Sequence, residues 1–290
     1  MCDELTATDD DAALARAGLS RRDFAATGAL AALAGCMTGS EAATAPDLTE
    51  RSVSFAAPDG TVDAFFVHPA KGKHPGVILW PDIAGLRDAY KVMARRLAEA
   101  GYAVLAVNQY YRSAPAPILN SISEWRTPAG QERLKPMLPL LTPEGITRDA
   151  KAFVAFLDRQ KAVDKRRGIG GNGYCQGGPF TVRTAAAVPS RVKAAASFHG
   201  GGLVTDKSDS PHRLLASTTA SYLIAVARND DARAPTDKDA FRAAAQVAGR
   251  PAEVEVYAAD HGWCTLDAPI YDKGEAERAW ARLLALFAGL

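Results

Sequence analysis

The feature that most constrains the fold of this chain is a glycine-rich run around one cysteine, Gly170-Gly171-Asn172-Gly173-Tyr174-Cys175-Gln176-Gly177-Gly178. It follows a short strand-like run at residues 167–169 and leads into residues 179–182, which can open a helix. A nucleophile held on a tight strand-to-helix turn needs small neighbours, because its backbone is strained and crowded. The glycines two residues before and after the cysteine meet this need. The run therefore predicts a nucleophile turn with Cys175 at its apex; the alternative is a buried structural cysteine beside a glycine turn.

Two further candidates follow later in the chain. Asp230 comes shortly after an apolar run at residues 222–227, which is typical of a buried parallel strand. His261 follows residues 252–257, which alternate between apolar and polar as a strand does. Both side chains would stand just past the carboxyl ends of strands, where open α/β sheets bind their ligands. The order of nucleophile, acid and histidine is that of the α/β-hydrolase fold, a mostly parallel central sheet flanked by helices, and we predict that fold with a triad on Cys175.

Three motifs resemble those of the dienelactone hydrolases, the cysteine-dependent branch of the α/β-hydrolases: Gly173-Tyr174-Cys175-Gln176-Gly177-Gly178, His261-Gly262 and Tyr110-Tyr111-Arg112. The resemblance extends from about Ser52 to Leu290. It implies that Cys175 is the nucleophile, His261 the base and Asp230 the acid. Asp231 is the alternative acid, because the doubled aspartate leaves the register open by one residue.

The nucleophile turn also predicts where an oxyanion would be stabilised. The backbone amide of Gln176 points to the start of the following helix, where the amide and the helix dipole favour negative charge. The resemblance implies a second amide, that of Ile83, in the turn after a buried strand at residues 75–80. It also implies a carboxylate near the thiol, and Asp82 stands where the family usually has glutamate. Such a carboxylate would disfavour the thiolate until substrate binds; the alternative role of Asp82 is an N-terminal cap.

Arg112 is the candidate for recognition of a substrate carboxylate. The resemblance implies a clamp in which the planar guanidinium holds two oxygens. The alternative is an ordinary structural ion pair. The dienelactone enzymes have a second arginine shortly after the histidine, whereas this chain has Gly262-Trp263-Cys264-Thr265 there. This departure argues against assuming dienelactone as the substrate.

Composition limits the other possibilities. With 290 residues and 48% hydrophobic content, the chain can bury a sizeable core in a single domain. A net charge of +1 argues against nucleic acid as a partner. The four cysteines, at positions 2, 36, 175 and 264, lack zinc-site spacing. His261 and Cys264 lie three residues apart, but nothing nearby completes a tetrahedral set. We therefore expect no metal and no cofactor, and a monomer.

The first 45 residues look like an export signal, and residues 46–290 form the predicted hydrolase domain. A twin-arginine motif at Ser20-Arg21-Arg22-Asp23-Phe24 precedes an alanine-rich apolar segment at residues 25–33, too short to span a membrane. Leu33-Ala34-Gly35-Cys36 resembles a lipobox, and Ala43-Thr44-Ala45 is a site for ordinary signal peptidase. We expect export to the periplasm, with Cys36 as a candidate lipid anchor. The alternative is an amphipathic N-terminal helix that contains two arginines.

The other elements follow from periodicity and from turn residues. We expect a strand pair at 52–55 and 62–68, helices at 87–100, 146–162 and 275–287, strands at 102–107 and 193–198, and a proline-rich lid or pocket wall at 113–144. Trp125, Met137 and Leu138 could line a pocket there, although burial against the core is the simpler outcome. His199 ends the strand at 193–198, where the family has an aromatic residue before glycine. We expect it to be a pocket or structural residue.

These features favour a hydrolase of small carboxylic esters or lactones that forms a thioester at Cys175. Two other classes stay open. One is a non-catalytic exported binding lipoprotein on a hydrolase scaffold, since a fold does not fix a function. The other is a redox-sensing thiol protein that uses Cys175 with Cys264.

Overall fold

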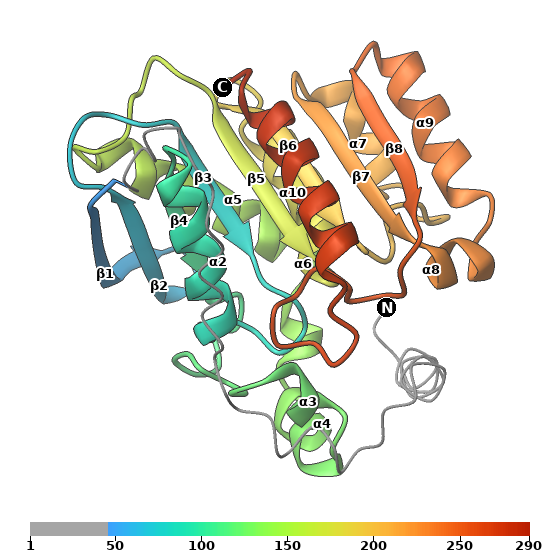
Figure 1. Ribbon diagram of the computed structural model, residues 1–290, viewed down its shortest axis with the longest axis horizontal. Coiled ribbons are helices and arrows are strands. Elements are labelled where there is room, and N and C mark those ends of the chain that lie inside the picture. Colours follow the sequence, from blue (N-terminus) through green and yellow to red (C-terminus); the bar gives the residue numbers. More distant parts are fainter. Residues whose placement is uncertain (1–45) are drawn as a thin grey trace, which may run out of the picture.

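An eight-stranded sheet runs through the molecule in the order β1-β2-β4-β3-β5-β6-β7-β8 (Figure 1). The computed structural model describes residues 46–290. The strands are β1 (Leu48–Ala57), β2 (Gly60–Pro69), β3 (Gly76–Trp80), β4 (Ala103–Val107), β5 (Ile169–Tyr174), β6 (Val192–Phe198), β7 (Ser221–Ala227) and β8 (Ala252–Tyr257). β1 pairs antiparallel with β2 and β2 with β4, and every other pair is parallel. This is the predicted α/β-hydrolase arrangement.

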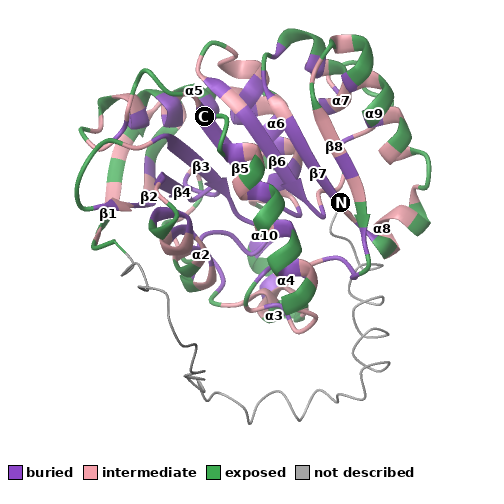
Figure 2. Cartoon of the chain, turned by 45° about the horizontal axis from the view of Figure 1, so that its top comes forward, coloured by how far each residue is buried: buried purple, intermediate pink, exposed green. Residues whose placement is uncertain are grey.

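Helices cover both faces of the sheet. α2 (Asp88–Glu99) and α10 (Lys273–Phe287) lie on one face, in front in Figure 1. α5 (Pro143–Arg159), α6 (Gly177–Ala187) and α9 (Asp237–Ala248) cover the other. The central strands β3, β4 and β5 are buried along their whole length (Figure 2). Strands buried on both faces are mostly apolar or small, which is why these strands lack a regular polar alternation. Asn172 of β5 is a buried polar exception.

The strand before Cys175 is longer than predicted. We expected it at residues 167–169 with the glycines in the turn, but β5 includes Gly170, Gly171 and Gly173 and ends at Tyr174. A Cβ on Gly170 would lie 2.8 Å from the ring of Phe287 of α10. Glycine at position 170 therefore lets α10 pack directly on this strand. The glycine-rich sequence, which is typical of a turn, forms a strand here because of that tertiary contact.

The proline-rich segment is also more regular than expected. It contains α3 (Ile122–Trp125), α4 (Pro128–Leu134) and the 3-10 helix η2 (Leu138–Leu140). Its apolar side chains pack on Ile83 and Ala84 after β3 and on Tyr110 after β4. Trp125, Met137 and Leu138 are partly buried against this cluster. The segment therefore packs across the ends of two central strands, next to the predicted site.

Four further helical elements of the described chain were not predicted from the sequence. They are α7 (Pro211–Leu214), the 3-10 helix η3 (Leu215–Ser217), α8 (Arg228–Arg233) and the helix α9 given above. α8 begins directly after β7, so the short run that carries Asp230 is helical. The other predicted helices and strands occur at their expected places, within a few residues at their ends.

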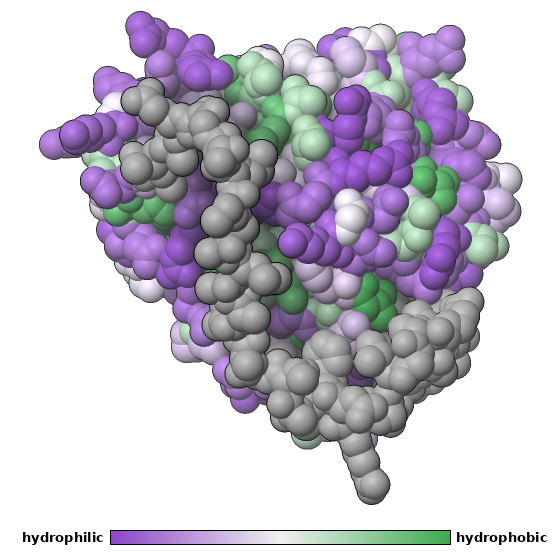
Figure 3. Space-filling model, in the orientation of Figure 1, coloured by the Kyte–Doolittle hydropathy of each residue, from purple (hydrophilic) through white to green (hydrophobic). Residues whose placement is uncertain are grey.

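Hydrophilic side chains cover most of the described surface seen in Figure 3, and hydrophobic ones form small separate groups. No helix within residues 46–290 is long and apolar enough to cross a membrane. The predicted signal peptide and the predicted lipid attachment at Cys36 lie outside the described residues.

Candidate active site

Cys175 occupies a strained turn between β5 and α6. Its backbone φ is 50°, in the left-handed region that few residues other than glycine adopt. A side chain at Gly173 would collide with the carbonyl of Gly177, and one at Gly177 would collide with the carbonyls of Trp80 and Pro81. Both glycines are therefore required by close backbone approach. The turn has the geometry predicted for a nucleophile, and Cys175 is buried at its apex.

The structure brings His261 onto Asp230. The Nδ1 of His261 lies 2.7 Å from Oδ2 of Asp230, and the backbone N–H of His261 donates to Oδ1 of Asn229 over 2.9 Å. Asp231 turns away and accepts a 2.6 Å bond from Nζ of Lys238. Asp230 is thus the aspartate that contacts His261, and the contact of Asn229 was not foreseen.

The sulfur of Cys175 belongs to the same cluster. Sγ of Cys175, a ring nitrogen of His261 and a ring nitrogen of His199 all lie within 4.8 Å of one another. Because Asp230 engages Nδ1 of His261, Nε2 is the nitrogen suited to exchange a proton with the sulfur. Among the described residues this is the one group of three that offers ligand atoms to a metal ion.

The two predicted oxyanion amides lie on adjacent loops. Tyr110 Oη is 2.7 Å from the carbonyl oxygen of Ile83 and 2.9 Å from Oε1 of Gln176, so one phenol spans both loops. Within residues 46–290, the backbone N–H groups of Ile83 and Gln176 donate to no protein acceptor. Two uncommitted amides beside a nucleophile turn are suited to bind a developing oxyanion.

Asp82 is held in a buried ion pair. Arg87 donates two bonds to it, of 2.7 and 2.8 Å, and the N–H of Ala84 donates a third of 2.9 Å. Arg87 also binds Asp267, at 2.7 and 2.8 Å. Burial alone would lower the pKa of Arg87, but the charge of Asp82 and the hydrogen bonds to Asp267 and Asp82 outweigh it and hold that pKa well above its usual value.

These contacts bear on both predicted roles of Asp82. The alternative role of Asp82 as an N-terminal helix cap is wrong. The N-cap residue of α2 is Arg87, and Asp82 lies five positions before it. The predicted influence of Asp82 on the Cys175 thiol stays a prediction. The hydrogen bonds of the Asp82 carboxylate described above go to Arg87 and to the N–H of Ala84. Through these bonds Asp82 shapes the loop that carries Ile83.

Arg112 lies in a second ion-pair network. Its guanidinium donates to Asp149 at 2.8 and 2.9 Å and to Asp59 at 2.6 and 3.1 Å. The hydroxyl of Tyr111 also donates to Asp149, over 2.7 Å. These bonds tie the β1–β2 turn to α5. The contacts support the structural alternative for Arg112, and the substrate clamp gains no support from them.

A hollow of about 190 Å³ opens beside the His261–Asp230 pair. Both residues lie in its wall, together with the apolar side chains of Leu203, Ile224, Val226 and Phe241. Its volume is enough for part of a small molecule.

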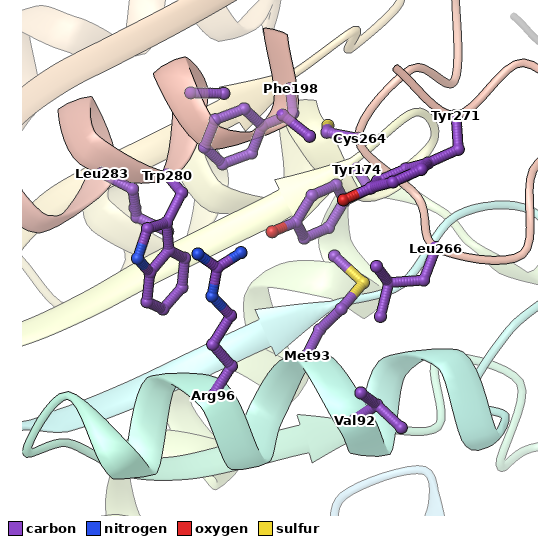
Figure 4. Close-up of a pocket in the computed structure, with 12 residues that line it drawn as sticks. Val92, Met93, Arg96, Tyr174, Phe198, Cys264, Leu266, Tyr271, Trp280 and Leu283 are labelled. Carbon is purple, nitrogen blue, oxygen red and sulfur yellow. The ribbon is translucent and has the colours of Figure 1, made fainter. Parts of the chain in front are cut away.

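Cys264 lies in a different place, in an apolar slot between α2 and α10 (Figure 4). The slot holds about 60 Å³ and is lined by residues such as Met93, Tyr174 and Trp280. Cys264 is a free, buried thiol, and burial raises its pKa well above the usual value. A thiol that stays protonated is a poor partner in disulfide exchange. The redox alternative, which needs Cys264, therefore gains no support.

The profile of the dienelactone hydrolase family matches residues 62–290 of this sequence. The chain belongs to the dienelactone hydrolase family. A relative from Methylorubrum extorquens, provisionally named a carboxymethylenebutenolidase, is 29% identical over 96% of this chain and 97% of its own. A Bradyrhizobium protein, provisionally named a 2-oxo-3-(5-oxofuran-2-ylidene)propanoate lactonase, is 26% identical over 58% of this chain and 64% of its own.

Solved structures of the family show the same fold. A crystal structure assigned provisionally as a dienelactone hydrolase from Klebsiella pneumoniae superposes with a TM-score of 0.71 at 23% identity, covering 84% of this chain and 100% of that one. A dienelactone hydrolase-like promiscuous phosphotriesterase from metagenomic libraries gives 0.66 at 22% identity, over 83% of this chain and 98% of its own.

Proposed function

We propose that this protein hydrolyses small carboxylic esters or lactones through a thioester on Cys175. The observation that carries the proposal is the cluster of Cys175, His261 and Asp230, in which the imidazole sits between a carboxylate at 2.7 Å and the nucleophile sulfur. This is the arrangement in which a neutral imidazole can activate a thiol. The names of the family relatives support a lactone or ester as the substrate class.

In the first half-reaction, Nε2 of His261 takes the thiol proton and Sγ of Cys175 attacks the carbonyl carbon. Asp230 holds the imidazole through Nδ1 and stabilises the imidazolium that forms. The amides of Ile83 and Gln176 stabilise the oxyanion, an effect of about 3–4 kcal/mol per donor in related enzymes. His261 then protonates the leaving oxygen as the carbon–oxygen bond breaks, which leaves a thioester.

In the second half-reaction, His261 takes a proton from water, and the hydroxide attacks the thioester carbonyl. The carbon–sulfur bond breaks, the acid leaves, and the proton returns to the sulfur. The thiolate is a better leaving group than an alkoxide, so the cysteine suits activated esters and lactones. The hollow beside His261 would hold part of the substrate during both steps.

The test is the intact mass of the reduced protein after brief exposure to p-nitrophenyl acetate. Cys175→Ala and His261→Ala are compared, with Cys264→Ala as the matched control at a thiol outside the cluster. We expect one acetyl group on Cys175, and loss of turnover in the first two variants only. A reduced, alkylatable Cys175 that forms no adduct and gives no turnover would sink the proposal and favour the binding-protein alternative.

We also propose export by the twin-arginine route, with lipid attachment at Cys36. The motif order in residues 1–45 supports it. Replacing Arg21 and Arg22 by lysine should retain the protein in the cytoplasm of a bacterial host, and Cys36→Ser should abolish palmitate labelling. Labelling that survives Cys36→Ser would contradict the anchor. We expect a monomer, which light scattering tests.

A further inference from the structure

His199 faces the nucleophile turn from the next strand. It follows β6, is 1% exposed, and has a backbone φ of 42°. Its own N–H donates to the carbonyl of Ala225 over 2.8 Å. Its Nδ1 lies 3.1 Å from the backbone nitrogen of Cys175, which also donates to the carbonyl of Phe198 at 3.0 Å. Two strained residues at the ends of neighbouring strands are therefore joined by a hydrogen bond.

This bond determines the tautomer of His199. A backbone N–H can only donate, so Nδ1 has to accept and the proton of the neutral ring is on Nε2. Nε2 is buried and has no partner among the described residues. The ring centroid is 4.7 Å from that of His261 and 5.2 Å from that of Trp263. A buried donor without a partner is unfavourable, so this tautomer is held by the bond at Nδ1 and not by any bond at Nε2 within residues 46–290.

A metal site is the competing interpretation, because Cys175, His199 and His261 offer three ligand atoms within 4.8 Å. A metal ion at Nε2 of His199 would require the ring proton on Nδ1. That proton would then point at the backbone N–H of Cys175. Two hydrogen-bond donors, with their nitrogen atoms 3.1 Å apart, would face each other without an acceptor. The observed contact therefore favours a neutral ring with a proton on Nε2 over a metal ligand.

We propose that His199 is a positioning residue for the nucleophile: its Nδ1 holds the backbone amide of Cys175, and its neutral ring fills the space beside His261. The inference rests on the proposed function of Cys175. Holding the amide fixes the direction of Sγ at a turn that is otherwise strained. A neutral ring also avoids a second positive charge next to His261 when His261 takes the thiol proton.

The test compares His199→Asn with His199→Leu in the full-length, reduced protein. Asparagine offers an oxygen near the position of Nδ1 and tolerates a left-handed backbone, whereas leucine has similar bulk and no acceptor. We expect His199→Leu to slow acylation by p-nitrophenyl acetate by about tenfold or more with KM within about twofold. We expect His199→Asn to recover most of the rate. Equal loss in both variants, or wild-type acylation in His199→Leu, would overturn the proposal.

A second measurement does not depend on activity. In protein labelled with ¹⁵N-histidine, the five histidines give separate ring signals, and His199→Asn identifies that of His199. We expect the Nε2–H tautomer around neutral pH, unchanged by Zn²⁺. An Nδ1–H tautomer, or a zinc-dependent shift at Nε2, would overturn the proposal. If wild-type protein forms no acyl-enzyme while the tautomer is as expected, the proposed function fails and the hydrogen bond stands.

Discussion

Replacing Arg87 by methionine should destabilise the protein strongly. Arg87 is 1% exposed, and its removal leaves Asp82, at 2% exposure, as a buried carboxylate without its cation. Breaking a buried pair in this way costs about 3–5 kcal/mol. Asp267 adds less, because its side chain is 24% exposed and water can solvate it. In a domain of this size the loss corresponds to a fall in Tm of about 6–20 °C.

The assay is thermal and urea unfolding followed by circular dichroism, with Arg95→Met as the matched control. Arg95 lies on α2 and pairs with Glu50 at 2.6 Å. Like Arg87, it also stacks on an aromatic ring, but its side chain is 37% exposed. Exposed pairs contribute about 0–1 kcal/mol, so we expect a small change there. The double variant Asp82→Asn/Arg87→Met should recover part of the stability. An Arg87→Met loss no larger than that of Arg95→Met would refute the reasoning.

Three further predictions concern Asp230, His199 and Cys264. Asp230→Asn should lower kcat by about 10⁴-fold, because asparagine favours the wrong tautomer of His261. In Asp231→Asn, kcat should stay within about threefold of the wild-type value. Equal effects of the two substitutions would contradict the assignment of Asp230 as the acid. Burial and the neighbouring His261 lower the pKa of His199 well below 6.5. Below about pH 6.5 the unfolded chain therefore takes up a proton at this residue and the folded chain does not. The free energy of unfolding should then decrease as the pH falls, by up to about 1.4 kcal/mol per pH unit. Unfolding measured against pH should lack this slope in His199→Asn. The titratable groups facing His199 are Cys175, Tyr174 and His261. Cys264 should resist iodoacetamide until the protein unfolds, as mass spectrometry can show; alkylation in the folded state would argue against its burial.

The candidate site was predictable where local chemistry constrains it. A nucleophile turn requires small residues at fixed positions, so Gly173 and Gly177 mark it in the sequence alone. The strands before Asp230 and His261 are apolar or alternating because of how they are buried. These patterns indicated the fold and the order of the three candidate residues of the proposed triad. The boundary of β5 was less predictable, because Gly170 is required by the packing of Phe287 of α10 and not by a turn.

The identity of the contacting side chains depended on the tertiary structure. Asp230 and Asp231 are equivalent in sequence, and only the start of α8 directs the first to His261 and the second to Lys238. The ion pair of Asp82 with Arg87 and the hydrogen bond between His199 and Cys175 could not be predicted from the residues around them in the sequence. Sequence patterns report which face of an element is buried. Which charges and hydrogen-bonding groups meet is decided by how separate elements pack, and that is a property of the folded chain.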